Sequence, residues 1–260
     1  MANAAPKIEV DALTIGFGDR VIQRDVSFTV SPGAIFAIMG GSGCGKSTLL
    51  RAMVGLLRPE VGTIRFGRED YWAASDERRA EIGRGFGVLF QSGALWSSMN
   101  TADNVALPLR MLTRLDEESI AALVRLKLAL VGLDGASQTM PAELSGGMRK
   151  RAGLARALAL DPGILFFDEP SAGLDPVAAG RLDDLILELR DGFGATVVMV
   201  SHDLPSLFAI CDSGIFLDGD SKTAIAHGAP RMLREQCDHP LVHAFMNRER
   251  SAEGGGHGDR

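Results

Sequence analysis

The first forty residues carry the hydrophobic pattern of β-strands. Apolar and polar positions alternate loosely from 8 to 15, and a second strand-like stretch follows from 21 to 30. A Ser-Pro-Gly turn at 31–33 precedes the continuous apolar run 34–39, which ends in glycines and predicts a buried strand. The next residues, 45–54, have the composition of a helix.

Strand-like and helix-like stretches alternate through much of the remaining chain. Further strands are predicted at 63–66, 86–90, 164–167 and 195–200. Such alternation is typical of an α/β fold with a largely parallel sheet.

Between residues 92 and 160 the pattern changes to a mostly helical insert. The stretches that suit helices there are 101–112, 116–131 and 146–160. Near the end, the Asp-Gly-Asp-Ser sequence at 218–221 predicts a hairpin between strands 214–217 and 223–226, followed by helices at 230–235 and 241–247. The last ten residues, 251–260, contain four glycines and are expected to be disordered.

Composition describes an ordinary globular chain and excludes several functional classes. Hydrophobic residues make up 46% of the 260 residues, and the formal net charge is −6, so no global basic field attracts nucleic acid or anionic lipid. No apolar run approaches the roughly 20 residues of a membrane span, and residues 1–7 lack the features of a secretion signal. The three cysteines are widely spaced, which fits neither a disulfide framework nor a zinc site and favours a reducing cytoplasm.

A phosphate-binding loop follows the apolar run 34–39. The sequence from Gly40 to Thr48 matches G-x-x-x-x-G-K-[ST] and lies between a predicted strand and a predicted helix, as this motif requires. Glycines let backbone N–H groups converge on phosphate, and the helix N-terminus favours negative charge. Lys46 is expected to reach the β- and γ-phosphates of a nucleotide, and Ser47 to ligate Mg²⁺.

Two adjacent carboxylates end the predicted strand at 164–167. Neighbouring side chains on a strand diverge, so Asp168 and Glu169 can take different tasks. We expect Asp168 to hold Mg²⁺, commonly through water, and Glu169 to orient and deprotonate the attacking water.

A third element, Leu-Ser-Gly-Gly at 144–147, lies 98 residues after Lys46 (144 − 46) and opens a predicted helix. This combination resembles the nucleotide-binding subunits of ABC transporters. The resemblance covers roughly residues 8–228 and implies a P-loop NTPase core with an N-terminal antiparallel β subdomain and a helical insert at 92–160, all in one ATPase domain of residues 1–250. A helix N-terminus rich in backbone donors can bind phosphate by the same physics as the first loop.

The resemblance assigns further residues. Phe17 lies where such subunits stack an aromatic ring on adenine, Gln91 where they sense Mg²⁺ and meet the membrane partner, and His202 where they contact the γ-phosphate. Glu169, His202 and Gln91 are therefore the expected catalytic residues, and Ser47, Gln91 and Asp168 the metal ligands. The residues expected to bind ATP are Phe17, Gly40, Gly41, Ser42, Gly43, Cys44, Gly45, Lys46, Ser47, Thr48, Ser145, Gly146, Gly147 and Asp175.

Three of these positions leave alternatives open. Phe17 can be an ordinary surface phenylalanine, and His202 a structural histidine. Cys44 can be merely a small residue in a variable loop position. Alternatively, because it lies at a helix N-terminus, its thiol pKa is expected to fall, which predicts alkylation that ATP blocks.

Met148, Gly173 and Phe17 replace residues that are commoner in the family, and none of these changes removes a phosphate or metal contact.

The stretch after Gln91 narrows the resemblance. Residues 90–109 are similar to the Mla and Mce phospholipid-transport ATPases, in Phe-Gln-Ser-Gly-Ala-Leu and a later Asn-Val-Ala-Leu-Pro-Leu. Leu95, Trp96 and Met99 form an apolar group that can receive a short helix of a permease or can belong to the core of the insert. Similarly, 240–248 can dock on a neighbour or form a solvated terminal helix.

The function implied is ATP hydrolysis that powers lipid transport through a separate permease. The implied assembly is a head-to-tail homodimer at the cytoplasmic face of the inner membrane, with integral-membrane permease subunits, an Mce-type lipid-binding subunit and no nucleic acid. An ATPase of a small-solute importer remains the nearest alternative. A soluble ABC mechanoenzyme fits less well, because the stretch between the two nucleotide grips is too short for a long coiled coil and shows no heptads.

Overall fold

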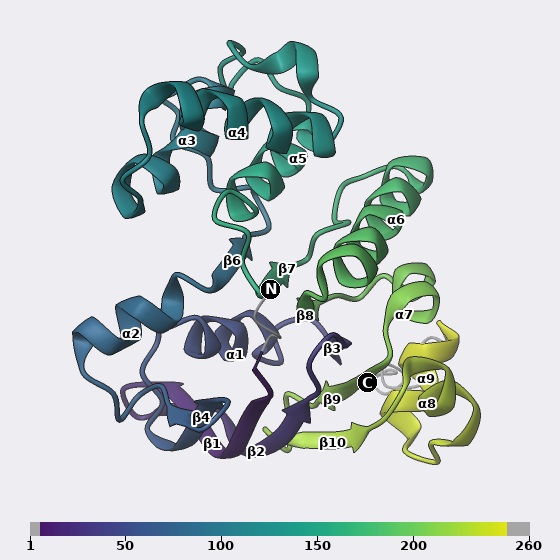
Figure 1. Ribbon diagram of the computed structural model, residues 1–260. Coiled ribbons are helices and arrows are strands. Elements are labelled where there is room, and N and C mark those ends of the chain that lie inside the picture. Colours follow the sequence, from purple (N-terminus) through teal and green to yellow (C-terminus); the bar gives the residue numbers. More distant parts are fainter. Residues whose placement is uncertain (1–5, 249–260) are drawn as a thin grey trace, which may run out of the picture.

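A six-stranded sheet forms the centre of the computed structural model, which describes residues 6–248 (Figure 1). The strand order is β10-β9-β3-β8-β7-β6, with parallel pairing from β9 to β6 and β10 antiparallel to β9. The strands are β3 (Ile35–Gly40), β6 (Phe86–Leu89), β7 (Ile164–Asp168), β8 (Thr196–Val200), β9 (Ser213–Leu217) and β10 (Ala224–His227). The apolar runs of β3, β7 and β8 are buried along their whole length, as is typical of parallel strands covered on both faces.

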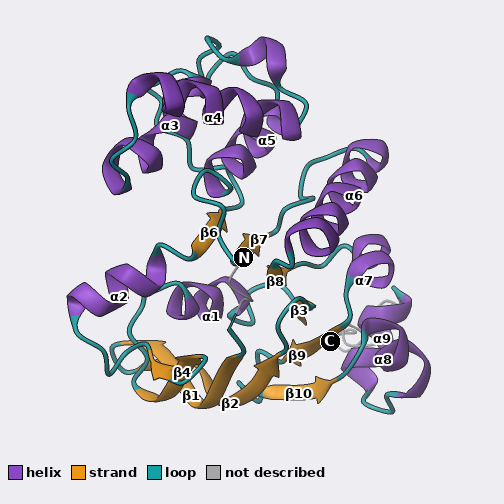
Figure 2. Cartoon of the chain, viewed as in Figure 1, coloured by secondary structure: helices purple, strands orange, loops and turns teal. Residues whose placement is uncertain are grey.

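A smaller antiparallel sheet is formed by the N-terminal segment, in the order β2-β1-β4-β5. Its strands are β1 (Ile8–Phe17), β2 (Arg20–Val30), β4 (Val61–Phe66) and β5 (Glu69–Asp70). In Figure 2 these strands lie at the opposite end of the molecule from the helical lobe described below. The predicted N-terminal antiparallel β subdomain is therefore confirmed.

Helix α1 (Lys46–Met53) lies between the two sheets, because it contacts β1 of the small sheet and β3, β7 and β8 of the large one. Leu49, Leu50 and Met53 are fully buried in a core that both sheets share. This packing fixes the helix N-terminus at the carboxyl end of β3, where the phosphate loop lies.

Three helices form a lobe at one side of the large sheet (Figure 1), where α5 contacts β6. They are α3 (Thr101–Leu112), α4 (Glu117–Leu130) and α5 (Gly146–Ala157), with a short 3₁₀ turn at Asp134–Ala136. Each helix begins at a side-chain cap: Asn100, Asp116 and Ser145 accept a bond from a backbone N–H of the first turn. Helix α5 ends three residues earlier than the predicted stretch 146–160.

The predicted hairpin and C-terminal helices are present as β9, β10, α8 (Pro230–Gln236) and α9 (Pro240–Asn247). One face of α9 packs on the chain's own sheet: Val242 and Met246 are buried, and the Phe245 ring lies 5.0 Å from that of Phe216. Helix α9 is therefore not a fully solvated helix.

The hydrophobic pattern did not predict α2 (Asp76–Gly83), α6 (Pro176–Phe193), α7 (Leu204–Ile210) or the short strand β5. The predicted disordered tail, 251–260, lies outside the described residues. The assignment of residues 1–250 to one domain stays a prediction.

Candidate nucleotide-binding site

The predicted site residues lie at one edge of the large sheet. Strands β3, β8 and β7 are neighbours and run parallel, so their carboxyl ends meet at the same edge. The phosphate loop (residues 40–48) follows β3, Asp168 ends β7, and Ser201 and His202 follow β8. Ligands of α/β proteins bind at this edge of the sheet.

Glycines give the phosphate loop its shape. Gly40 has φ 141°, and a Cβ there would lie 2.3 Å from the Leu217 carbonyl oxygen, so only glycine fits. Gly45, at the start of α1, has φ 102° and equally little room, since a Cβ would lie 2.6 Å from Cγ2 of Ile22. Lys46 is 8% exposed, and its Nζ donates to the carbonyl oxygens of Gly40 (2.9 Å) and Gly41 (2.7 Å). The ammonium group therefore lies within the curve of the loop.

Ser47 and Asp168 meet at the base of this loop. Ser47 Oγ donates a hydrogen bond to Asp168 Oδ1 at 2.8 Å, although the two residues are 121 positions apart. A hydroxyl and a carboxylate side by side next to a phosphate loop supply the oxygen ligands that Mg²⁺ prefers. The donor set therefore fits a nucleotide–Mg²⁺ complex.

Glu169 and His202 form the second close pair. His202 Nδ1 lies 2.7 Å from Glu169 Oε2, and the carboxylate side chain is 12% exposed whereas the imidazole side chain is 63% exposed. Glu169 has φ 52°, a left-handed backbone conformation that is uncommon for a residue with a side chain. A solvated histidine next to a sheltered carboxylate at a strand end is an arrangement that can hold and orient a water molecule.

A cavity of about 640 Å³ opens over the phosphate loop. Gly41 to Cys44 line it on one side, His202 on another, and residues 218–220 and α9 complete it. Ser145, Gly146 and Gly147 do not line this cavity. Lys46, Ser47, Asp168 and Glu169 do not line it either. The Ser47–Asp168 hydrogen bond and the Glu169–His202 contact, not this cavity, bring the phosphate loop, the carboxylates and the histidine together within one chain. Neither contact includes the signature loop (residues 144–147).

The signature loop forms the start of α5. Ser145 Oγ accepts a bond from the Met148 backbone N–H at 3.2 Å, while Ser145 and Gly146 themselves are exposed. Gly147 approaches the 169–175 turn, since a Cβ there would lie 3.3 Å from Leu174. The N-terminus of α5, with its free backbone donors, is therefore open to solvent.

The Gln91 loop (residues 91–100) packs its backbone against α5. A Cβ on Gly153 of α5 would lie 2.9 Å from the Gly93 carbonyl oxygen, so the helix and the loop are in direct contact. Arg156 of α5 donates to the carbonyl oxygens of Ala94 (2.7 Å) and Gly93 (3.0 Å), and burial lowers its pKa. Gln91 itself is exposed.

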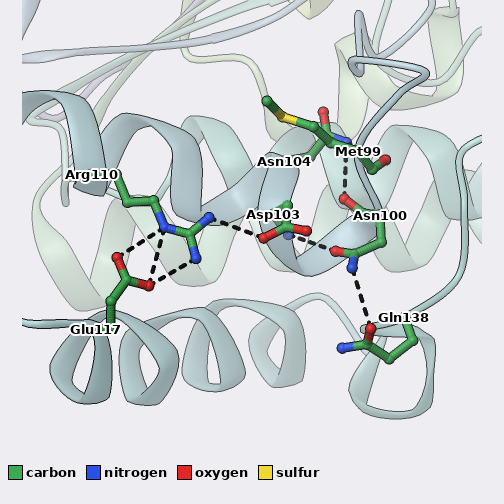
Figure 3. A network of polar contacts seen from close by, with 7 residues as sticks. All are labelled: Met99, Asn100, Asp103, Asn104, Arg110, Glu117 and Gln138. Atoms are coloured by element: carbon green, nitrogen blue, oxygen red, sulfur yellow. Dashed lines mark hydrogen bonds and ion pairs between the residues drawn. The ribbon is translucent and has the colours of Figure 1, made fainter.

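Asn104 fixes the far half of this loop (Figure 3). Its side chain is fully buried, accepts from the Trp96 backbone N–H (2.7 Å), and donates to the carbonyl oxygens of Trp96, Met99 and Asn100. In the same view Arg110 of α3 joins Asp103 of its own helix to Glu117 of α4. The Asn-Val-Ala-Leu-Pro-Leu sequence thus begins with the residue that gives the loop its shape.

Leu95, Trp96 and Met99 of the Gln91 loop were predicted either to receive a permease helix or to belong to the core of the helical insert. Leu95 packs against the core of the helical lobe, and Met99 is half-buried. Trp96 is 59% exposed. Only Trp96 therefore presents a large apolar surface, and a permease contact there stays a prediction.

ATP binding by Phe17 and Asp175 stays a prediction. Phe17 ends β1 and is 54% exposed, so its ring is accessible to a planar ligand. Asp175 caps α6 by accepting bonds from the backbone N–H groups of Val177 and Ala178, which lower its pKa. The hydrogen bonds of the Asp175 side chain are therefore those of a helix cap.

The predicted low pKa of Cys44 is wrong. The thiol is only 3% exposed, and burial raises its pKa despite the nearby Lys46 ammonium. The loop closes over the side chain, because a Cβ on Gly40 would lie 2.8 Å from Cys44 Sγ. Desolvation therefore outweighs the helix N-terminus, and Cys44 fits the alternative of a small packing residue.

The hydrophobic pattern also missed a buried glutamine that supports the loop. Gln23 of β2 is fully buried, and its Nε2 donates to the carbonyl oxygens of Cys44 (2.6 Å) and Asp218 (2.8 Å). A polar residue among the apolar positions of a strand was the available signal. Through Gln23 the small sheet holds the phosphate loop and the β9–β10 turn together.

The family follows from comparison with known proteins. A family model described as ABC transporter matches residues 23–172, more than half of the chain. The chain belongs to the ABC transporter family. It is the subunit that binds and hydrolyses ATP in this family, and hydrolysis is coupled to transport, as predicted.

Similar proteins include transport ATPases. The intermembrane phospholipid transport system ATP-binding protein MlaF of Escherichia coli is 45% identical over 92% of this chain and 88% of its own. The MlaF of Haemophilus influenzae is also 45% identical, over 90% of this chain and 88% of its own. A probable ribonucleotide transport ATP-binding protein, mkl, of Mycobacterium bovis is 44% identical over 94% of this chain and 67% of its own.

Solved structures confirm the predicted ABC ATPase fold. A dimeric ATP-binding cassette in a post-hydrolysis state, bound to ADP and phosphate, matches 85% of this chain and 98% of its own with a TM-score of 0.79 and 26% identity. CbiO1 of Clostridium perfringens, part of an ABC transporter complex, matches 90% of this chain and 92% of its own with the same TM-score and identity. None of the helices within residues 6–248 has the length and apolarity to cross a bilayer.

Proposed function

We propose that this chain powers the movement of phospholipid between membranes, through a separate integral-membrane permease, from the cytoplasmic face of the inner membrane. The observation that carries this proposal is the 45% identity to MlaF over 92% of the chain. The Asn104-centred Gln91 loop supports it, because the stretch that resembles lipid-transport ATPases is the one that presents Trp96 at the surface.

The chemistry of the proposed site follows from the two close pairs. Lys46 and the loop N–H groups bind the phosphates, and Ser47 and Asp168 hold Mg²⁺, with Gln91 as a further ligand. Bound Mg²⁺ neutralises phosphate charge as it develops. Glu169 accepts a proton from the attacking water, and His202, whose Nδ1 lies 2.7 Å from Glu169 Oε2, keeps that carboxylate oriented and meets the γ-phosphate.

A Glu169→Gln variant tests this assignment. The variant is expected to bind ATP while hydrolysis falls by about 10²- to 10⁴-fold, because the amide cannot accept the proton. Glu118→Gln, at an exposed position in the first turn of α4, serves as the matched control and is expected to keep full activity. Near-normal turnover by the Glu169→Gln complex contradicts the proposed role.

We further propose that two copies of the chain dimerise head to tail. Ser145 and Gly146 of the signature loop are exposed and take no part in the contact between Ser47 and Asp168, so the backbone donors at the start of α5 are available to nucleotide held by a second copy. Each ATP then touches Gly40–Thr48 of one copy and Ser145–Gly147 of the other, and hydrolysis removes the ligand that joins them.

Complementation tests the dimer directly. Lys46→Ala and Ser145→Ala homodimers each lack a complete site, whereas a mixed dimer of the two variants contains one intact phosphate loop facing one intact signature loop. Mixing the inactive variants is therefore expected to restore hydrolysis. If each site were built within one chain, no mixture would contain an intact site and activity would stay absent.

The cargo is tested on the complex assembled in membranes. Isolation through a tag on this chain, followed by mass spectrometry of proteins and lipids, is expected to recover a permease, an Mce-type lipid-binding subunit and phospholipid. ATP-dependent transfer of labelled phospholipid between vesicles, absent with Glu169→Gln, supports the proposal. The similarity to mkl, a probable ribonucleotide transport ATP-binding protein, favours a second candidate, transport of a small polar solute such as a ribonucleotide. Recovery of a soluble solute receptor without lipid favours that candidate.

A further inference from the structure

One buried lysine beside the site was not among its predicted residues. Lys150 lies in α5, is 8% exposed, and donates from Nζ to the backbone carbonyl oxygens of Glu169 (3.0 Å), Pro170 (2.9 Å) and Ala172. Within residues 6–248 no ion pair includes it. Burial lowers its pKa, and the nearby Glu169 charge opposes that shift. Three carbonyl oxygens thus replace the water that a buried ammonium group loses.

The turn that Lys150 binds is held in an unusual conformation. Glu169 has φ 52°, a left-handed conformation that is unfavourable for a residue with a side chain. The Glu169 backbone N–H donates to the Val200 carbonyl oxygen at 2.9 Å, and its carbonyl oxygen also accepts from the Ala172 N–H at 3.2 Å. Three carbonyl dipoles therefore converge on one point, and without a cation there they would repel one another.

The same turn sets the direction of the Glu169 side chain. With the backbone reversed at Glu169, the carboxylate meets His202 Nδ1 at 2.7 Å. A relaxation of Glu169 toward an ordinary backbone conformation would rotate the carboxylate away from this position. The alignment of the carboxylate therefore depends on the cation beneath the turn.

We propose that Lys150 is a positioning residue for ATP hydrolysis: its ammonium group holds the 169–172 turn so that Glu169 stays aimed at the attacking water. The inference rests on the proposed role of Glu169. Because α5 begins at the signature loop, Lys150 also ties the catalytic turn to the helix whose N-terminus meets nucleotide on a second copy. A movement of α5 is thereby passed to Glu169 of the same chain.

Lys150→Met tests the proposal in the full-length chain assembled with its membrane partners, because methionine keeps the length of the side chain without its charge. Lys127→Met is the matched control: Lys127 is also a buried lysine of the helical lobe, 5% exposed, but its Nζ bonds the Asp161 carboxylate. Thermal unfolding and ATP binding are measured for both variants together with kcat and KM.

We expect kcat of Lys150→Met to fall by about 10²-fold, since a misplaced catalytic group costs about this much, while KM and the Kd for ATP stay within about threefold. Lys150→Arg keeps a cation and is expected to recover kcat to within about tenfold of wild type. Lys150→Met combined with Glu169→Gln is expected to lose nothing beyond Glu169→Gln alone, because Lys150 acts through Glu169. Lys127→Met is expected to keep wild-type kcat.

Three results overturn the proposal: an unchanged kcat in Lys150→Met, an equal loss in Lys127→Met, or an additive loss in the double variant. If Lys150→Met does not fold, Lys150→Gln replaces it and the same outcomes apply, with a loss of about tenfold because one neutral donor remains. Glu169→Gln is measured alongside, so the failures are separable. Turnover by Glu169→Gln refutes the role of Glu169, whereas turnover by Lys150→Met with an inactive Glu169→Gln refutes only the role of Lys150.

Discussion

Two helical glycines predict different effects of the same substitution on stability. Gly153 is buried in α5, where a Cβ would lie 2.9 Å from the Gly93 carbonyl oxygen and 3.0 Å from both Gly93 Cα and Leu89 Cδ1. Gly180 is exposed in α6 and has nothing within 4 Å of the Cβ position. Alanine is added to a helix in both cases, so the two variants differ only in what the methyl group meets.

The magnitudes decide the sign. Gly→Ala in a helix interior gains about 1 kcal/mol from propensity, and this gain is expected in full for Gly180→Ala. At Gly153 two of the three contacts are backbone atoms of a loop that Arg156 holds by hydrogen bonds. Overpacking of this kind costs about 1–3 kcal/mol, which cancels or exceeds the gain. The free energy of unfolding of Gly153→Ala is therefore expected to be about 1–3 kcal/mol lower than that of Gly180→Ala.

Urea unfolding followed by circular dichroism measures this difference, with both variants in the same buffer without nucleotide. Equal stabilisation by the two substitutions would refute the tight contact between α5 and the Gln91 loop. A loss of stability in Gly180→Ala would refute the assignment of that glycine to an open helix surface.

Two further predictions concern titratable groups. Burial raises the pKa of Asp183 to about 6, and Ser206 Oγ lies 2.8 Å from Asp183 Oδ2 and 2.9 Å from Asp203 Oδ2. The folded chain thus binds this proton more tightly than the unfolded chain, so Asp183 destabilises the protein as pH rises from about 4 to 6. Asp183→Asn is expected to raise the free energy of unfolding by about 1 kcal/mol at pH 7.5, after allowance for solvent screening, and by less at pH 5. Urea unfolding at both pH values measures this difference. An equal effect at the two pH values would contradict the prediction. Cys44 is expected to react with iodoacetamide far more slowly in the folded chain than in urea, with or without ATP. Mass spectrometry of the labelled peptide measures this. Rapid labelling that ATP blocks would instead support a lowered pKa of the Cys44 thiol.

The sequence predicted well those features that local chemistry determines. The strands of the large sheet appeared as short apolar runs, and their ends differ from the prediction by one or two residues. The phosphate loop was predictable because glycine and lysine spacing reflects a backbone shape. The pairing of Ser47 with Asp168 followed once both were placed after parallel strands.

Helices α2 and α6 escaped this reasoning for different reasons. None of the residues of α2 is buried, so hydrophobic periodicity carries no signal there, and only the Ser75 cap and the acidic first turn mark its start. Helix α6 had clear boundary signals in Asp175, Pro176 and the left-handed Gly194. The resemblance assigns Asp175 to ATP binding, and Pro176 and Gly194 were not interpreted as helix boundaries.

Contacts between distant segments were the least predictable part of the site. The pKa of Cys44 depends on burial beneath Gly40 and not on its position at a helix N-terminus. Lys150 is an unremarkable cation in the sequence of a helix, and its role appears only when the carbonyl oxygens of the 169–172 turn converge on it. The spacing of residues along the chain predicts neither the burial of Cys44 nor the contacts of Lys150.

Helix α5 connects the parts of the molecule that the proposed mechanism must coordinate. Its N-terminus is the signature loop, its middle packs Gly153 on Gly93 of the Gln91 loop, and Lys150 holds the turn after Glu169. Because close-packed contacts transmit displacement instead of absorbing it, a shift of α5 caused by nucleotide on a second copy moves the Gln91 loop and the catalytic turn together. In the proposed dimer, one rigid helix would make hydrolysis in one site depend on the occupancy of the other and on a membrane partner at the Gln91 loop.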